Sequence, residues 1–430
     1  MKAYQEMTRE ELLAEEDSLK QQYEEFCAKG LKLDMSRGKP AACQLDLSMP
    51  MLDVLHSDSH LISAHGADLR NYGTLDGIDE AKELIAAMIE TKPENVIVYG
   101  NASLNIMYDC ISRSMVHGVL DHTPWMKLDK IKWLCPVPGY DRHFAITEFF
   151  GIEMINIPLL EGGPDMDLVE ELVSADDSIK GIWCVPKYAN PTGTSYSDET
   201  VRRFANLKPA AADFRIYWDN AYCVHHLYEE KEKQDHILDI LSECEKAGNP
   251  DLVYEFCSTS KITFSGAGIS GLAASEANRE DIKRQLGIQT IGFDKINQLR
   301  HVKFLKDADG IAEHMKKHAA IIRPKVEMLL KKFENELGGL GVGTWTEPRG
   351  GYFITYTANP GCAKEIVKKA KDAGMVMTGA GAPYPYKKDP DDAVIRIAPT
   401  MPPLEELVDA GELFIICVKL TSVQKLLGEI

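Results

Sequence analysis

Five short apolar runs between residues 95 and 275 limit the possible folds more than any other feature of the chain. Each run is rich in β-branched or aromatic residues and ends in polar or glycine-rich residues, and helix-length stretches separate the runs. The runs are NVIVYGNAS (95–103), IKWLCPVPGYD (131–141), GIWCVPKYANPTG (181–193), FRIYWDNAY (214–222) and LVYEFCSTSK (252–261). Continuous apolar strands that alternate with helices are typical of a mainly parallel sheet covered by helices on both faces. The sequence therefore predicts an α/β fold.

The chain changes character after about residue 305. A long charged stretch (312–337) predicts a helix, and the apolar stretches GGYFITYT (350–357) and AVIRIAPT (393–400) predict strands with a helix between them. This pattern indicates a second, smaller α+β unit. A chain of 430 residues also exceeds what one hydrophobic core usually supports.

The beginning of the chain predicts a helix of its own. Thr8 and Glu11 have the spacing of a capping box, so we expect a helix from Glu10 to about Lys29. The large sheet leaves no obvious place for this helix, and we expect it to pack with the smaller unit. The expected domains are an N-terminal segment (1–48), a large domain (49–304) and a small C-terminal domain (305–430).

Composition argues against several classes of protein. The formal net charge is −18, whereas a protein that binds nucleic acid usually has a positively charged face or arm. No run approaches the roughly 20 apolar residues that span a bilayer, and the charged, amphipathic start is unlike a signal peptide. The ten cysteines never form a C-x-x-C pair, and Cys135, Cys184 and Cys223 lie in apolar runs. We therefore expect reduced, buried thiols in a cytoplasmic protein without a metal site, with metal ligation or disulfides as the alternatives.

In parallel sheets, ligands bind at the carboxyl ends of the strands. Small residues follow Tyr99, and a helix that begins at about Ser103 would offer backbone N–H groups and a positive dipole to a phosphate. Tyr140 could stack on a flat ring, and Asn190 could donate an amide hydrogen bond. Taken singly, these residues also fit a glycine-rich turn, a packing tyrosine and a loop turn.

Asp219 and Lys261 are more unusual. Asp219 follows an apolar run, so its carboxylate would lie at a buried edge, which is costly unless a cation such as a protonated pyridine nitrogen meets it. Tyr222 could direct its hydroxyl to a neighbouring phenolic oxygen. Lys261 stands among hydroxyls and glycines after another apolar run, where it is either an exposed loop lysine or a nucleophile for a carbonyl. With hydroxyls nearby for a phosphate, this combination indicates pyridoxal phosphate.

The motifs together resemble a known family. NPTG (190–193), DNAY (219–222) and STSK (258–261) occur in the order found in fold-type I pyridoxal-phosphate aminotransferases, flanked by NYGTLDG (71–77) and VIRIAP (394–399). The chain resembles the aspartate aminotransferase family over nearly its whole length. The segments SRGKPAACQLDLS (36–48) and SKITFSGAG (260–268) are similar to a divergent bacterial branch of that family.

The resemblance implies roles for the residues at the centre of the site. Lys261 is expected to form the Schiff base with the cofactor and to carry the 1,3-proton transfer. Asp219 is expected to pair with the pyridine nitrogen, supported by His143. Asn190 and Tyr222 are expected to hold the phenolic oxygen.

The resemblance also implies contacts with the rest of the cofactor. Tyr140 is expected to stack on the ring. Tyr72 resembles the tyrosine that reaches the phosphate of the partner subunit, so a homodimer with shared sites is expected. The residues at phosphate-binding positions are Ala102, Ser103, Ser258 and Ser260.

For the substrate, an amino acid or a 2-oxo acid, the resemblance implies a carboxylate site. Arg396 resembles the arginine that binds the α-carboxylate, and Gly38 matches the glycine that lies against the same group. Asn190 is expected to contact the substrate as well as the cofactor. A dicarboxylic substrate needs a second cation, for which Arg37, Lys39 and Lys295 are candidates. Each of these three could equally lie on a solvated surface.

One position departs from the family pattern. The usual phosphate-binding arginine, eight residues after the lysine, is Ile269 here. Backbone N–H groups and hydroxyls, or another cation, must then hold the phosphate.

The expected activity is an aminotransferase, with L-aspartate and 2-oxoglutarate as the substrates. Two alternatives share the scaffold. A β-lyase or decarboxylase would use nearly the same cofactor residues. A non-catalytic regulator that senses pyridoxal phosphate would carry a basic DNA-binding domain at the N-terminus, whereas here one acidic helix precedes the first motif.

Overall fold

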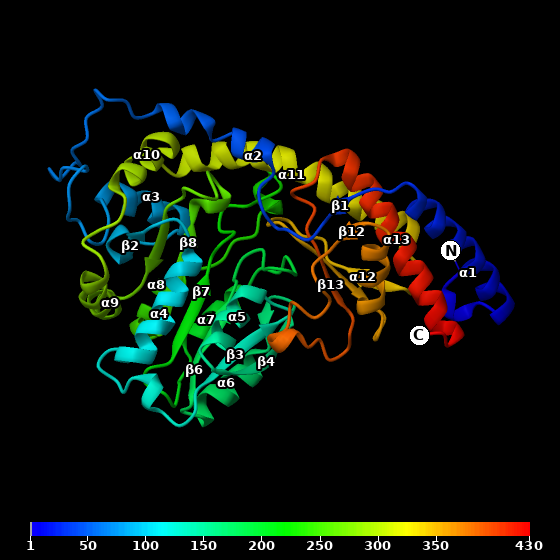
Figure 1. Cartoon of the computed structure of the whole chain (residues 1–430). Helices are drawn as coiled ribbons and strands as arrows, with labels where there is room; N and C mark the ends of the chain where they lie inside the picture. The colour runs from blue at the N-terminus through cyan, green and yellow to red at the C-terminus, as the bar shows by residue number, and fades with distance from the viewer. Residues whose placement is uncertain (1) are drawn as a thin grey trace.

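The computed structural model describes residues 2–430, and its largest element is an eight-stranded sheet in the order β2-β9-β8-β7-β6-β3-β4-β5 (Figure 1). The strands are β2 (Val96–Tyr99), β3 (Lys132–Val137), β4 (Glu153–Leu160), β5 (Gly163–Pro164), β6 (Ile179–Cys184), β7 (Arg215–Asp219), β8 (Val253–Ser258) and β9 (Ser270–Ala273). Strand β9 is antiparallel to β2 and β8, so β2 runs in the same direction as β8, β7, β6, β3 and β4. The five apolar runs therefore end at one edge of the sheet, and the predicted α/β fold is confirmed.

Helices cover both faces of this sheet. Successive side chains on a strand point to opposite faces, so on β7 Ile216 and Trp218 enter one core while Tyr217 enters another. Burial on both sides explains why the strands are continuously apolar. The first core is completed by α3 (Asp79–Ile89), α6 (Met166–Ala175), α7 (Asp198–Ala205), α8 (Ile240–Lys246) and α10 (Lys295–Leu305), and the second by α4 (Ser103–His117), α5 (Asp141–Phe149) and α9 (Glu276–Gln289).

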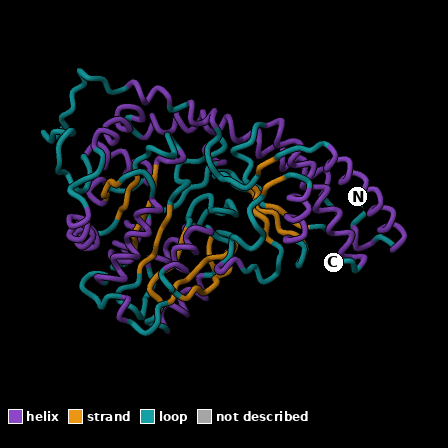
Figure 2. The backbone as a smooth tube through the Cα atoms, viewed as in Figure 1, coloured by secondary structure: helices purple, strands orange, loops and turns teal. Residues whose placement is uncertain are grey.

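A second group of strands lies apart from the large sheet (Figure 2). Strands β10 (Gly343–Trp345), β11 (Ile354–Ala358) and β13 (Val394–Ile397) form an antiparallel sheet, while β1 (Leu33–Asp34) pairs with β12 (Met375–Val376) in parallel. They enclose a third core with α11 (Ala308–Leu337), α12 (Ala363–Asp372) and α13 (Leu404–Leu427). Helix α11 places Met315 in a core of the large sheet and Phe333 in the third core, so it joins the two. Within residues 2–430, no helix combines the length and apolar character needed to cross a membrane.

The N-terminal helix α1 (Arg9–Ala28) lies beside α13, and the two chain ends are close together (Figure 1). The predicted capping box is confirmed, because Glu11 N–H donates to Thr8 Oγ1 at 3.2 Å and Thr8 N–H donates to Glu11 Oε2 at 2.7 Å. Tyr23 donates its hydroxyl to the Lys369 carbonyl oxygen at 2.7 Å. A short helix, α2 (Ala42–Asp46), follows β1. The domain limits expected from the sequence stay a prediction.

Candidate active site

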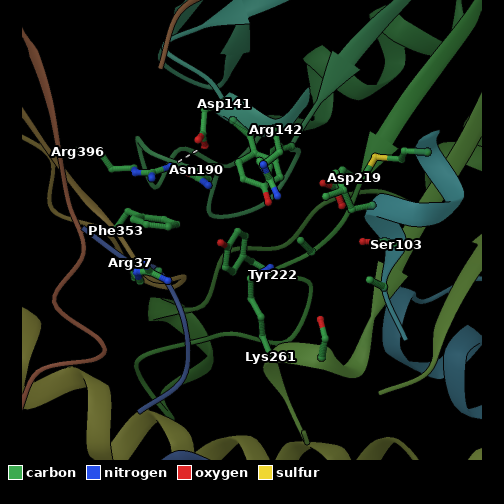
Figure 3. Close-up of a pocket in the computed structure, with 18 of the residues that line it drawn as sticks. Arg37, Ser103, Asp141, Arg142, Asn190, Asp219, Tyr222, Lys261, Phe353 and Arg396 are labelled. Atoms are coloured by element: carbon green, nitrogen blue, oxygen red, sulfur yellow. Dashed lines mark hydrogen bonds and ion pairs between the residues drawn. The ribbon is translucent and has the colours of Figure 1, made fainter. Parts of the chain in front are cut away.

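A cavity of about 680 Å³ lies where the strands of the large sheet end, beside the antiparallel sheet. Figure 3 shows Arg396, Phe353 and Arg37 on one side of it, Asp219 and Ser103 on the opposite side, and Lys261 with Tyr222 between them. The fold thus brings most of the expected site residues to one place. Those that line the cavity are Gly38, Ala102, Ser103, Tyr140, Asn190, Asp219, Tyr222, Ser260, Lys261 and Arg396.

Two of the expected cofactor residues lie just outside the cavity. His143 is 1% exposed and lies behind Asp219. Ser258 does not line the wall, because its hydroxyl donates to the Asn101 carbonyl oxygen at 2.8 Å and accepts the Ser260 N–H at 3.0 Å. The Ser258 hydroxyl therefore positions the loop that carries Lys261, and Ser260 is the serine that faces the cavity.

Of the three candidate cations for a second substrate carboxylate, only Arg37 lies on the cavity wall. Arg37 lines the cavity, whereas Lys39 is exposed and lies off the wall. Lys295 is neither on the wall nor solvated, because its side chain is buried and its ammonium donates to the Gly73 carbonyl oxygen at 3.1 Å. Tyr72, next to Gly73, is 81% exposed and does not reach the cavity of its own chain.

Asp219 is held at the end of β7 and is 3% exposed. Asp219 Oδ2 lies 2.9 Å from His143 Nε2, and the His143 ring stacks on Trp183 with centroids 4.3 Å apart. Among the residues that the structure describes, Asp219 Oδ1 has no hydrogen-bond partner. A buried acceptor left unpaired costs about 1–3 kcal/mol, and more when it is charged. This geometry favours a ligand that presents a positively charged donor to Oδ1.

Lys261 ends a short 3₁₀ turn, η7 (Thr259–Lys261), that follows β8 directly. Its Nζ lies 4.9 Å from the centroid of the Tyr222 ring. Burial lowers the pKa of the Lys261 amine, and the negative charge of Asp219 offsets part of this shift. A lower pKa increases the fraction of neutral amine, which is the nucleophilic form.

Two tyrosines near Lys261 keep their phenolic protons. Burial raises the pKa of Tyr222 well above its ordinary value. Burial and the charge of Asp219 raise the pKa of Tyr140 to about 12. Both hydroxyls can therefore donate hydrogen bonds at neutral pH.

The end of the cavity near Ser103 is suited to an anion. Helix α4 begins there with Ala102 as its N-cap, and no side chain caps the first turn. Its N–H groups and dipole favour a negative group, as do the Ser103 and Ser260 hydroxyls. Ile269 is 1% exposed, and its N–H donates to Thr259 Oγ1 at 2.9 Å, so an apolar residue fills that position.

The opposite end is built around Arg396 on β13. Its guanidinium carbon lies 5.0 Å from the centroid of the Phe353 ring. Gly38 packs against the same ring, and a Cβ at this position would come within 2.0 Å of it, so only glycine fits without rearrangement. Arg396 Nη1 donates to Asn190 Oδ1 at 3.3 Å and to Asp141 Oδ1 at 3.1 Å.

Several lining residues were not expected from the sequence. Asp141 and Arg142 directly follow Tyr140, and this position at a strand end could have indicated them. Phe353 stands in an apolar run that carries no such signal. The other unexpected wall residues are Ser36, Leu104, Met107, Val185 and Ala221.

The residues present fit pyridoxal phosphate. The unpaired Asp219 Oδ1 suits a protonated ring nitrogen, Lys261 suits the aldehyde, and the start of α4 suits the phosphate. Within residues 2–430, no three His, Cys, Asp or Glu side chains are grouped so as to hold a metal ion. The fold and the cavity are those of a pyridoxal-phosphate enzyme.

Comparisons with known proteins agree. The family model of the aspartate amino-transferases matches residues 7–430. The chain is 46% identical to a Mycolicibacterium smegmatis protein named as an aminotransferase, over 99% of this chain and 100% of the relative. It is 44% identical to an aspartate aminotransferase of Corynebacterium glutamicum, over 95% of this chain and 94% of the relative. A crystal structure of an aspartate transaminase from Corynebacterium glutamicum superposes with a TM-score of 0.95 at 43% identity, covering 98% of this chain and 99% of that one.

The chain therefore belongs to the aspartate aminotransferase family. It is an aminotransferase that uses pyridoxal phosphate to move an amino group between an amino acid and a 2-oxo acid.

Proposed function

We propose that the substrates are L-aspartate and 2-oxoglutarate. The observation that carries this proposal is that Arg37 and Arg142 line the same cavity as Arg396 and Lys261. A dicarboxylic substrate needs a cation for each carboxylate, and arginine is the side chain best suited to bind one. The name of the Corynebacterium glutamicum relative supports the same substrate class.

We further propose a role for each residue at the centre of the cavity. Pyridoxal phosphate supplies an aldehyde and an electron-withdrawing ring that stabilises negative charge at the substrate Cα. The Lys261 amine would hold the aldehyde, and as a free amine it would move the proton at the substrate Cα. Asp219 keeps a proton on the ring nitrogen, and His143 holds Asp219 in place.

The remaining cavity residues orient the two molecules. Tyr222 and Asn190 would donate hydrogen bonds to the phenolic oxygen, and Tyr140 would stack on the ring. Arg396 binds the α-carboxylate on the side of the cavity opposite Asp219 (Figure 3). Because Lys261 lies between Arg396 and Asp219, a substrate whose carboxylate is held by Arg396 would place its Cα within reach of the Lys261 amine.

The test of the proposed substrates is a panel of amino acids added singly to the cofactor-loaded enzyme. Aspartate and glutamate should convert the bound cofactor, seen as a change in its absorbance, at low concentration. Alanine and aromatic amino acids should do so only at much higher concentration. A preference for a monocarboxylic amino acid would refute the proposal, and release of ammonia or carbon dioxide without an oxo-acid acceptor would indicate a lyase or decarboxylase.

We expect Arg37→Gln to lower kcat/KM for aspartate selectively. The loss of one hydrogen bond to a charged group, about 1.5–3 kcal/mol, corresponds to roughly a 10- to 150-fold decrease. Activity with alanine, which lacks the second carboxylate, should change little. Lys39→Gln is the matched control, because Lys39 is two residues away, exposed and off the wall. If Arg142→Gln shows the selective loss instead, the distal carboxylate binds at Arg142 and our assignment to Arg37 is wrong.

We also propose a homodimer in which Tyr72 completes the phosphate site of the partner subunit. The loop between residues 54 and 78 extends away from the large sheet (Figure 1), and Lys295 holds it through Gly73. An exposed tyrosine on such a loop can reach another subunit. The apolar Ile269 leaves the phosphate end without an arginine at that position, so a donor from a partner would matter more.

The dimer proposal predicts that Tyr72→Phe raises the dissociation constant of the cofactor. Loss of one hydrogen bond to the charged phosphate, about 1.5–3 kcal/mol, corresponds to roughly a 10- to 150-fold increase. In a mixture with Lys261→Ala subunits, each heterodimer should hold one site with both defects and one intact site. Activity should therefore reappear at a cofactor concentration too low for Tyr72→Phe homodimers. No recovery despite demonstrated heterodimers would place Tyr72 outside the shared site.

We propose a cytoplasmic location as well. All ten cysteines are free thiols, and eight of them are buried, as in a chain that folds under reducing conditions. Fractionation of cells that express the protein tests this directly.

A further inference from the structure

Arg396 is already paired with a carboxylate from its own chain. Asp141, the first residue of α5, places Oδ1 3.1 Å from Arg396 Nη1 (Figure 3). The Arg396 side chain is 10% exposed, whereas the Asp141 side chain is 35% exposed. The partly exposed carboxylate thus neutralises a nearly buried guanidinium.

The hydrogen bonds of Arg396 show which part of the guanidinium faces the cavity. Thr378 accepts from Nε at 3.3 Å and from Nη2 at 3.1 Å, and its own hydroxyl donates to the Ser36 carbonyl oxygen at 2.9 Å. Thr378 does not line the cavity, whereas Asp141 and Asn190, the two acceptors of Nη1, both do. The cavity-facing nitrogen is therefore Nη1.

This arrangement leaves no room for a substrate carboxylate in the usual geometry. A guanidinium has five N–H donors, and a carboxylate bound side-on takes two parallel ones. Asp141 and Asn190 accept from the two N–H groups of Nη1, and Thr378 accepts from Nε and from one N–H of Nη2. One remaining N–H on Nη2 cannot bind a carboxylate side-on. A substrate that uses Nη1 and Nη2 must first displace one of the two acceptors of Nη1. Asn190 is buried, whereas the Asp141 side chain is 35% exposed, so Asp141 is the acceptor that can leave.

We propose that Asp141 occupies the carboxylate site of Arg396 in the substrate-free enzyme and exchanges with the incoming substrate. The inference rests on the proposed role of Arg396 in binding the α-carboxylate. Asp141 can leave at small cost, because its carboxylate is partly exposed and stays at the positive end of α5, where a negative charge is favoured. Asp141 is then a positioning residue that stabilises the empty site and lowers the apparent affinity of every carboxylate ligand.

The test measures binding of succinate, which has two carboxylates but no amine to react, to the holoenzyme by calorimetry. Asp141→Asn should tighten succinate binding by roughly 2- to 5-fold, the effect of removing a partly exposed ion pair as competitor. KM for aspartate and for 2-oxoglutarate should fall by a similar factor, with little change in kcat. A crystal structure with succinate should show Asp141 Oδ1 beyond hydrogen-bond distance of Arg396 Nη1.

Two further variants keep the outcomes distinct. Glu148→Gln, an exposed position on the same helix, changes the net charge equally and should leave succinate affinity unchanged. Arg396→Gln should weaken succinate binding strongly. If Arg396→Gln weakens succinate binding but Asp141→Asn binds succinate no more tightly than the original enzyme, then Asp141 does not exchange with the substrate and the role of Arg396 stands. If Arg396→Gln leaves succinate affinity unchanged, the assignment of Arg396 itself is wrong, and the exchange fails with it.

Discussion

Lys261→Ala should reduce transamination between aspartate and 2-oxoglutarate by several orders of magnitude. Loss of general acid–base catalysis alone typically costs about 10²–10⁴-fold, and this change also removes the amine that binds the aldehyde. Within residues 2–430, no other lysine lines the cavity, so none is placed to substitute for Lys261. The fold should survive, since Lys261 follows β8 in a turn held by the Ser258 hydroxyl and not by its own side chain.

The measurement is steady-state activity of the purified variant, with its cofactor content determined separately. A small primary amine added to the buffer should restore part of the rate, because it can supply the missing base. Lys39→Gln serves as the control for removal of a positive charge away from the cavity wall. Activity within tenfold of the original enzyme would contradict the role of Lys261.

Asp219→Asn should bind the cofactor and yet react far more slowly. The substitution keeps the shape of the side chain but removes the charge that favours a proton on the ring nitrogen, so the ring becomes a weaker acceptor of electrons. A hydrogen bond to a charged group is worth about 1.5–3 kcal/mol, which corresponds to a loss of at least roughly 10- to 150-fold in kcat. Asp219→Glu keeps the charge and should retain more activity than Asp219→Asn.

Comparison of the two variants separates charge from structure. Asp219→Asn and Asp219→Glu both disturb the contact with His143. If the loss of activity came from disturbed packing and not from the lost charge, both variants should lose thermal stability and activity to a similar extent. If Asp219→Asn is as active as the original enzyme at full cofactor occupancy, Asp219 does not face the ring nitrogen. His143→Ala should give a smaller loss, because His143 only positions Asp219.

The large sheet and its ligand edge follow from local features of the sequence. Each central strand is apolar on both faces because two cores bury it, and this produces the continuous runs that predict a parallel sheet. The polar residues that end those runs must then meet at one edge. Asp219 and Lys261 could be singled out because Asp219 places a charge at the last residue of the buried strand β7 and Lys261 places one in the short turn that follows the buried strand β8.

The other end of the cavity could not be worked out in this way. The pair between Asp141 and Arg396 joins α5 of the large sheet to β13 of the antiparallel sheet, and no local pattern sets how the two sheets meet. Lys295 illustrates the same limit. Lys295 begins α10, a helix that carries both polar and apolar residues. Lys295 is nevertheless buried, because the loop at Gly73 folds over it and accepts its hydrogen bond. Contacts between distant segments decide such positions.

The central claim is that Lys261 carries the cofactor at the strand ends of the large sheet. Borohydride reduction of the cofactor-loaded enzyme, followed by digestion and mass spectrometry, tests it most directly. We predict that the reduced cofactor is attached to the peptide that contains Lys261 and that Lys261→Ala is not labelled there. Attachment at any other lysine, or none in an enzyme with bound cofactor, would contradict the account.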